Sequence, residues 1–161
     1  MRFRGEHNQR VDDKCRLSIP SGFRQLLETN GDSRLVLAKS TLHRCLQAYT
    51  ARDWEAREDR VMSLPSSDPA VQKLLHFQFA SAQAVEPDGH GRIVLAPALR
   101  AWAGIAAKEE IVLIGQVRRF EVWSGQAWAA MQSEIENAMY GANAASDALG
   151  AWNRSLADLG L

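Results

Sequence analysis

The sequence has few cysteines, no long apolar run and no histidine cluster. Its two cysteines, Cys15 and Cys45, form no Cys-x-x-Cys pair, which argues against a disulfide framework and against a zinc site. The four histidines are scattered along the chain, so neither a metal nor another cofactor is expected. No apolar segment approaches the roughly 18 residues of a membrane-spanning helix, and the polar opening MRFRGEHNQR lacks the apolar stretch of a secretory signal. We therefore expect a cytoplasmic protein that does not contact a membrane.

The chain also lacks net charge, because 19 Lys and Arg residues balance 19 Asp and Glu residues. A net charge of zero argues against non-specific affinity for nucleic acid. The charges are unevenly distributed, however: residues 1–50 contain nine basic and five acidic side chains, and the remaining 111 residues contain ten and fourteen. A basic first segment can still present one cationic face.

A repeated segment is the most informative feature that the sequence does contain. The segment DDKCRLSIP, which begins at Asp12, recurs as DGHGRIVLAP, which begins at Asp88. Arg16 of the first segment matches Arg92 of the second, at the same offset of 76 residues. A repeat with a fixed offset indicates two copies of one structural unit. A unit of about 75 residues buries little surface alone, so we expect the two copies to share a core.

Each repeated segment is predicted to form a β-hairpin. A strand precedes the turn, and a strand with alternating apolar residues follows it. Asp12 and Asp88 are expected to organise the turns by accepting hydrogen bonds from backbone N–H groups ahead of them. Gly91 supplies the positive φ that a bulged hairpin needs. Cys15 occupies the matching position in the first copy, where a positive φ would cost on the order of 1 kcal/mol.

The remaining pattern predicts an α+β fold, mainly β with short helices, built from two tandem copies of one unit. Helix-start signals stand at Thr50 and at Asp68 with its following proline. We expect three regions: a first module over 1–66, a linker helix and second module over 67–140, and a weakly structured tail over 141–161. Expected elements are helices at 21–28, 98–103, 68–79 and 152–159, and strands at 34–38, 44–49, 110–115 and 118–123.

Catalytic interpretations of the repeated turn are weak. Asp12 and Asp88 could be paired carboxylates of an acid–base site, but their positions at turn starts explain them and no nucleophile–base pair stands beside them. Cys15 could be a reactive thiol, since Lys14 and Arg16 flank it. Its match to a glycine instead indicates a position chosen for backbone geometry. We therefore do not expect an enzyme with a small-molecule substrate.

Arginine is the residue of the repeated turn with the least obvious structural need. Arg16 and Arg92 each follow the turn aspartate by four residues, and two roles remain open. Each could form a surface ion pair with that aspartate, worth at most about 1 kcal/mol. Each could also project from a two-stranded ribbon toward O6 and N7 of guanine in the major groove of DNA. Neighbouring residues that could contact DNA beside them are Arg4, Arg10, Lys14, Arg24 and His90.

Four segments resemble the MraZ family: FRGEHNQRVDDKCRLSIPSGFR, LVLAKSTLHRCLQAYTARDWEA, DGHGRIVLAPALRAWAGI and VLIGQVRRFEVWSGQAW. The resemblance runs in register over about 1–140. Each copy is similar to a SpoVT/AbrB-type swapped-hairpin module, and two such modules per chain, each with an Asp-x-x-x-Arg motif, are the hallmark of that family. The resemblance implies that the two tandem modules are related by a pseudo-twofold axis and form a compact β core.

The resemblance implies a bacterial transcriptional regulator, generally a repressor, of the division and cell-wall gene cluster. It implies a ring-shaped homo-oligomer that binds G-rich direct repeats of double-stranded DNA and is associated with the nucleoid. Carried over by position, Arg16 and Arg92 face the DNA, with Lys14 as a neighbour. The family's usual first motif has glycine where this chain has Cys15, which leaves the shape of the first turn open. The alternative is a ring-forming protein-assembly module without direct DNA contact.

Overall fold

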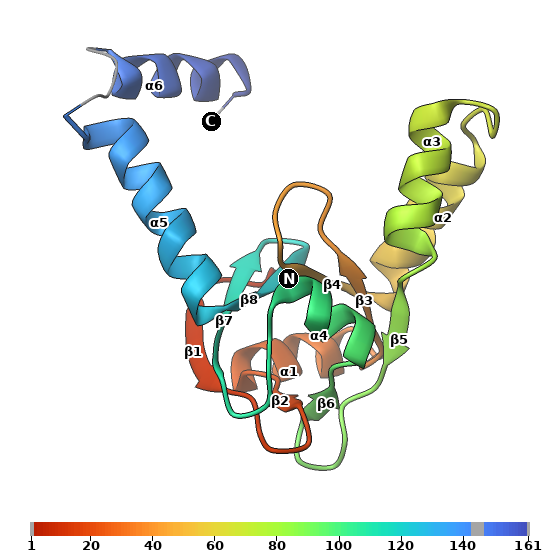
Figure 1. Cartoon of the computed structure of the whole chain (residues 1–161). Helices are drawn as coiled ribbons and strands as arrows, with labels where there is room; N and C mark the ends of the chain where they lie inside the picture. Colours follow the sequence, from red (N-terminus) through yellow and green to blue (C-terminus); the bar gives the residue numbers. More distant parts are fainter. Residues whose placement is uncertain (1, 143–146, 161) are drawn as a thin grey trace. The chain divides into compact units, whose positions relative to one another are not determined.

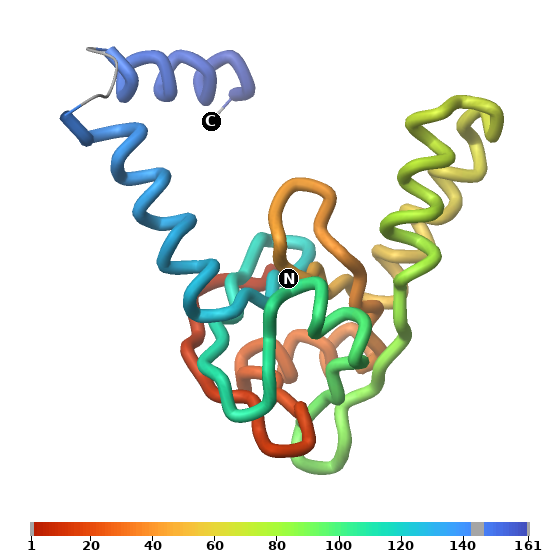
Figure 2. Tube along the Cα trace, in the orientation of Figure 1, coloured from red at the N-terminus to blue at the C-terminus, as the bar shows by residue number. Residues whose placement is uncertain are grey.

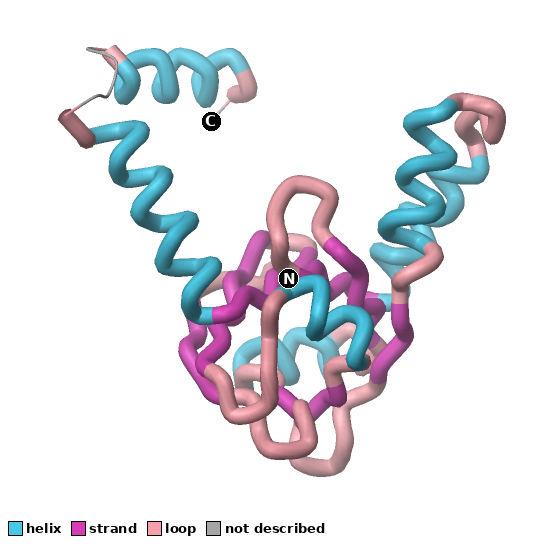
Figure 3. Tube along the Cα trace, viewed as in Figure 1, coloured by secondary structure: helices cyan, strands magenta, loops and turns pink. Residues whose placement is uncertain are grey.

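A computed structural model describes residues 2–142 and 147–160. The chain divides into two compact units, one up to Gly125 and one from Gln126 onward. The first unit contains all the strands of the described residues (Figures 1 and 3). Those strands are β1 (Glu6–Arg10), β2 (Arg16–Ser18), β3 (Leu35–Lys39), β4 (Leu46–Thr50), β5 (Gln83–Val85), β6 (Arg92–Val94), β7 (Glu110–Gln116) and β8 (Arg119–Ser124). Among the described residues, no helix is long and apolar enough to span a membrane.

Each of the two sheets contains strands from both copies. The larger sheet has the order β1-β7-β8-β4-β3-β5, and β2 pairs with β6 in a separate antiparallel ribbon. The predicted hairpins are therefore wrong: the strand before each turn pairs with the other copy, β1 with β7 and β5 with β3. Where a hairpin would continue, the Gln9 side chain instead bonds the backbone N–H and C=O of Ser18, at 2.9 and 2.7 Å. An alternating pattern shows which face of a strand is buried but not which strand lies beside it.

Strand register shows a pseudo-twofold relation between the copies. In the ribbon, Leu17 lies opposite Ile93, its own match at the offset of 76 residues. In the larger sheet, Gln47 lies opposite Glu121, its match after the two-residue slip between the copies. The predicted α+β class and the tandem pseudo-twofold arrangement are confirmed.

One hydrophobic core joins both copies, as expected. The ribbon contributes Leu17 and Ile93, each 1% exposed, and they pack with residues of the larger sheet. Phe23 of α1 (Ser21–Thr29) and Leu99 of α4 (Pro97–Ala103) complete this core. The Phe23 ring lies 5.1 Å from that of Phe120 in β8. The ribbon is therefore anchored by its inner face.

Two helices of the first unit begin where their cap residues predict. The Thr50 hydroxyl accepts the Asp53 N–H at the start of α2 (Ala51–Met62). The Asp68 carboxylate accepts the Ala70 N–H at the start of α3 (Pro69–Leu74). The helix predicted to reach residue 79 changes at Leu75 into a π-helix, η1 (Leu75–Phe79).

A smaller cluster of apolar side chains, separate from this core, lies under α2 and η1. Trp54 of α2 and Phe79 of η1 have ring centroids 4.9 Å apart. Gln78 of η1 is fully buried, and its side-chain amide donates to the Lys39 carbonyl oxygen at 2.8 Å. The π-turn thus turns both Gln78 and Phe79 toward the strands.

The second unit contains most of α5 (Gly125–Tyr140), together with α6 (Ala148–Asp158). The short helix expected at 152–159 therefore begins earlier than predicted. Arg154 pairs with Asp147 across the first turns of this helix, at 2.6 Å. Part of the tail expected over 141–161 lies outside the described residues, namely 143–146 and 161.

Candidate nucleic-acid interface

The first repeated turn is closed by the Asp12 carboxylate. Its Oδ1 accepts the backbone N–H groups of Lys14 and Arg16 at 2.9 and 2.8 Å. Its Oδ2 accepts the Arg16 Nε–H at 2.7 Å. The backbone N–H of Asp12 donates to the Arg16 carbonyl oxygen, and that of Cys15 donates to the Asp12 carbonyl oxygen. One side chain thus holds both the turn backbone and the arginine that ends it.

The second turn has the same hydrogen bonds. Asp88 Oδ1 accepts the backbone N–H groups of His90 and Arg92, and Oδ2 accepts the Arg92 Nε–H at 3.0 Å. Arg92 Nη2 also lies 2.9 Å from Oδ2. The backbone N–H of Gly91 donates to the Asp88 carbonyl oxygen at 2.8 Å. The two turns are therefore geometric copies, although their sequences differ at three of five positions.

Both turn carboxyls are held in their charged form. The backbone N–H of Arg16, and then its guanidinium, hold the pKa of Asp12 below the ordinary value of 3.8. The backbone N–H and guanidinium of Arg92 lower the pKa of Asp88 in the same way. Hydrogen bonds that favour the carboxylate are the physical cause in both turns.

The ribbon β2–β6 places the two turns side by side. The Ile19 N–H donates to the Gly91 carbonyl oxygen at 2.8 Å, and the Leu95 N–H donates to the Cys15 carbonyl oxygen at 3.0 Å. These bonds extend the ladder at each end, so each turn is tied to the strand of the other copy. Figure 2 shows the first turn in red and the second in light green at one end of the unit.

The outer face of the ribbon carries both arginines. Arg16 lies opposite Val94, and Arg92 lies opposite Ser18. Since side chains alternate along a strand, these four share the face away from the buried Leu17–Ile93 pair. The side chains of Arg16 and Arg92 are 25% and 29% exposed. The ribbon therefore presents two guanidinium groups, each held by a carboxylate of its own turn.

The two turns differ in the residue with positive φ. Cys15 has φ of 59° and Gly91 has φ of 72°. A Cβ on Gly91 would lie 2.4 Å from Cδ of Arg24, whose side chain covers the glycine. The matching arginine of the second copy, Arg100, instead donates its Nε–H to the Leu95 carbonyl oxygen at 3.1 Å. The sequence could not reveal the contact between Arg24 and Gly91, because these residues belong to different copies.

The other predicted DNA-binding residues lie around the turns. Lys14 and His90 occupy matching exposed positions in the two turns, and His90 Nδ1 lies 3.5 Å from Arg92 Nη2. Arg10 is exposed and pairs with Glu110 at 3.3 Å. Arg24 is half-buried, and its Nε has no hydrogen-bond partner among the described residues. The structure thus places Arg24 against the second turn.

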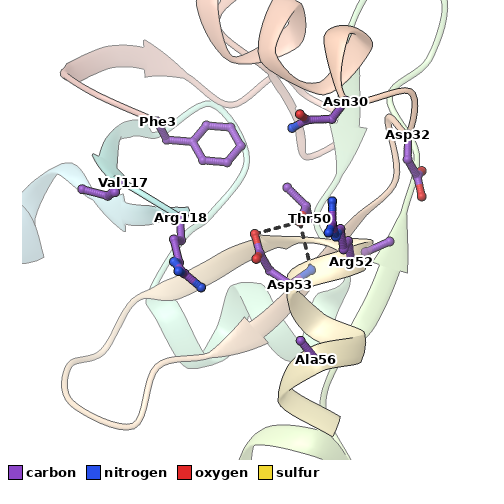
Figure 4. A pocket seen from close by; sticks show the side chains of 10 residues that line it. Phe3, Asn30, Asp32, Thr50, Arg52, Asp53, Ala56, Val117 and Arg118 are labelled. Carbon is purple, nitrogen blue, oxygen red and sulfur yellow. Dashed lines mark hydrogen bonds between the residues drawn. The ribbon is translucent and has the colours of Figure 1, made fainter. Parts of the chain in front are cut away.

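Little in the described residues resembles a catalytic centre. Burial raises the pKa of the Cys45 thiol to about 12, so this thiol is a poor nucleophile. No group of three or more metal-ligating side chains occurs in the part of the chain that is described. A cavity of about 500 Å³ lies beside the start of α2, where Phe3, Asp53 and Arg118 line it (Figure 4). The Asp53 carboxylate there accepts the Thr50 hydroxyl, whose oxygen caps the helix.

Comparison with known proteins agrees with the fold. The family described as "MraZ protein, putative antitoxin-like" matches residues 2–77 and 78–150. The chain belongs to the MraZ family. The two matched segments correspond to the two copies of the repeat. Strands of both copies lie in each sheet of this MraZ protein.

Three relatives named "Transcriptional regulator MraZ" illustrate the similarity. The protein of Coxiella burnetii (strain RSA 493 / Nine Mile phase I) is 36% identical over 132 residues, which cover 82% of this chain and 86% of the relative. That of Acidithiobacillus ferrooxidans (strain ATCC 23270 / DSM 14882 / CIP 104768 / NCIMB 8455) is 37% identical over 134 residues, or 81% and 87%. That of Shewanella oneidensis is 33% identical over 159 residues and covers 99% of both chains.

Proposed function

We propose that this chain is a sequence-specific DNA-binding transcriptional regulator that reads base edges with the outer face of the ribbon β2–β6. The observation that carries the proposal is the pair of arginines, Arg16 and Arg92, held at pseudo-twofold positions on one exposed face. A two-stranded ribbon fits the major groove, and arginine is the side chain that pairs with O6 and N7 of guanine. The relatives named transcriptional regulators support the regulatory role.

The aspartates do not exclude DNA contact by the arginines. A guanidinium has five N–H donors, so a carboxylate that accepts one or two leaves at least three for another acceptor. The bond from Arg16 Nε to Asp12 fixes the plane of the guanidinium before DNA arrives. A side chain ordered in advance loses less conformational entropy on binding. The turn carboxylates would therefore position the arginines rather than compete with the bases.

Basic side chains near the turns would contact phosphate and set the position of the ribbon in the groove. Lys14 and His90 are exposed in the turns, and Arg10 lies in β1. Arg24, which packs on the second turn beside Gly91, would contact the phosphate backbone of the DNA. These contacts would strengthen binding to any sequence, whereas Arg16 and Arg92 would select the sequence.

Self-association would compensate for the small contact area of one ribbon. We propose a ring-shaped homo-oligomer whose copies engage successive G-rich direct repeats upstream of the division and cell-wall gene cluster, where the protein acts as a repressor. Several weak contacts on one assembly gain affinity through high effective concentration. This offsets the zero net charge of the chain. Such a protein would work in the cytoplasm, at the nucleoid.

A second candidate function is a ring-forming protein-assembly module that does not touch DNA. The observation that favours it is that both arginines already have a carboxylate partner. In that case Arg16 and Arg92 would only stabilise their turns. Removal of either arginine would then lower thermal stability without a change in any DNA interaction.

The test compares Arg16→Ala with Arg34→Ala in a gel shift with the DNA upstream of the gene. Arg34 is a matched control, since it pairs with Asp32 at 2.7 Å but lies outside the ribbon. We expect Arg16→Ala to abolish the shift and Arg34→Ala to retain it, with the same oligomer in size-exclusion chromatography for both. A shift by Arg16→Ala equal to that of the unchanged chain would refute the DNA-reading role.

A further inference from the structure

The pseudo-twofold symmetry of the ribbon is broken on its outer face. Arg16 and Arg92 match each other, but Ser18 of β2 matches Val94 of β6. The cross-strand neighbours therefore differ: Arg16 has an isopropyl group beside it, and Arg92 has a hydroxyl group. One face thus presents two chemically distinct halves to whatever it binds.

Val94 is the apolar residue on the outer face of the ribbon. It is 55% exposed, whereas its neighbours in the sequence, Ile93 and Leu95, are each 1% exposed. A β-branched side chain has few rotamers, so its position on the ribbon is well defined. Because Val94 faces away from the core, that core gives no reason for an apolar side chain at this position.

We propose that Val94 is a specificity-determining residue that contacts the C5-methyl group of a thymine beside the guanine read by Arg16. This inference rests on the proposed DNA-reading function. Apolar contact with the thymine methyl is the one base-edge interaction in the major groove that favours an aliphatic side chain. Directly opposed residues of antiparallel strands have Cβ atoms about 4.5–5.5 Å apart, while successive bases along a strand are about 3.4 Å apart. The Cβ atoms of Val94 and Arg16 are therefore spaced by about one to two base steps, which puts neighbouring base pairs within reach of the two side chains.

Ser18 gives the other half of the ribbon a different preference. A serine hydroxyl donates and accepts hydrogen bonds and does not select one base. The half-site read by Arg92 therefore has no requirement for a methyl group. The preferred DNA site consequently has a guanine for each arginine but a thymine beside only one of them. The asymmetry of the ribbon would fix the orientation of each module on a direct repeat.

The test uses duplexes that the full chain selects from a random pool, in which each thymine is replaced in turn by deoxyuridine. This replacement removes one methyl group and no hydrogen-bonding group. We expect one thymine beside a selected guanine to matter for the unchanged chain, with an affinity loss of about fourfold by fluorescence anisotropy. The Val94→Ser variant should bind thymine and deoxyuridine duplexes equally well at that position.

The reciprocal variant sharpens the assignment. Ser18→Val places an isopropyl group beside Arg92 and should create a second position at which the thymine methyl strengthens binding. Melting temperature and size-exclusion chromatography of both variants establish that fold and oligomer are retained. If Val94→Ser fails this check, it is replaced by Val94→Thr, which keeps the branched shape and should retain a partial methyl preference through its own methyl group.

The outcomes separate this inference from the function on which it rests. If Arg16→Ala abolishes binding but no deoxyuridine replacement changes the affinity of the unchanged chain, the role of Val94 is refuted and the DNA-reading function stands. The same holds if Val94→Ser keeps the full methyl preference. If Arg16→Ala binds every duplex as the unchanged chain does, the DNA-reading function itself fails.

Discussion

The two turns of the ribbon have the same hydrogen bonds but a different residue at their positive-φ position. In the second turn that residue is Gly91, and the Arg24 side chain lies where a Cβ would be. In the first turn it is Cys15, and the matching Arg100 reaches the Leu95 carbonyl oxygen. The comparison shows that the need for glycine has two sources. One is the backbone angle, which both turns share, and the other is a neighbour from the opposite copy, which differs between them.

Substitution of the glycine gives the largest expected effect on stability. Gly91→Ala should lower the free energy of unfolding by about 1–3 kcal/mol. Most of this loss is backbone strain, and the far end of the flexible Arg24 side chain, which lies where the Cβ would be, must also move aside. Urea denaturation measures this change.

A second substitution separates the two causes. In the Gly91→Ala/Arg24→Ala double variant the collision is absent, so the glycine substitution should cost only about 1–2 kcal/mol relative to Arg24→Ala alone. Equal costs in the two backgrounds would show that the collision contributes nothing.

The reverse change in the first turn should have a smaller effect of opposite sign. Cys15→Gly relieves a positive φ of 59° but increases the flexibility of the unfolded chain. The net result should be a gain of about 0.5 kcal/mol in the free energy of unfolding. Thermal denaturation of the reduced protein checks it. A clear loss of stability would mean that the cysteine side chain makes a contact worth more than the strain it causes.

The carboxylates of the two turns should contribute to the fall in stability at acid pH. Each has a lower pKa in the folded chain than the ordinary 3.8. The stability that it contributes is therefore present above about pH 4 and is lost as the pH falls below that value. Asp12→Asn and Asp88→Asn should each flatten the decline of the melting temperature between about pH 4 and pH 2. An unchanged decline in either variant would place the acid sensitivity elsewhere in the chain.

Much of the fold could be predicted from local chemistry. The turn aspartates mark where each segment reverses, and Thr50 and Asp68 mark where two helices begin. The partner of each strand could not be predicted in this way. The segment from Glu6 to Arg10 has the same pattern whether it pairs with its own copy or, as it does, with β7.

For the candidate site too, contacts within one copy could be predicted from the sequence, and contacts between the copies could not. The bonds from Arg16 and Arg92 to their aspartates join residues four apart, so sequence spacing could suggest them. The pairing of Arg16 with Val94 joins residues of different copies. It therefore required the ribbon register, which local sequence does not contain.

Base reading by the two turn arginines is tested by a double variant, Arg16→Lys with Arg92→Lys, that keeps both charges and removes the paired donors of arginine. Affinity for a selected duplex and for a scrambled duplex is measured across a range of salt concentrations. We predict that discrimination falls by about tenfold or more, while the dependence of affinity on salt is unchanged because the number of cations is unchanged. A double variant that discriminates as well as the unchanged chain would contradict base reading by the two turn arginines.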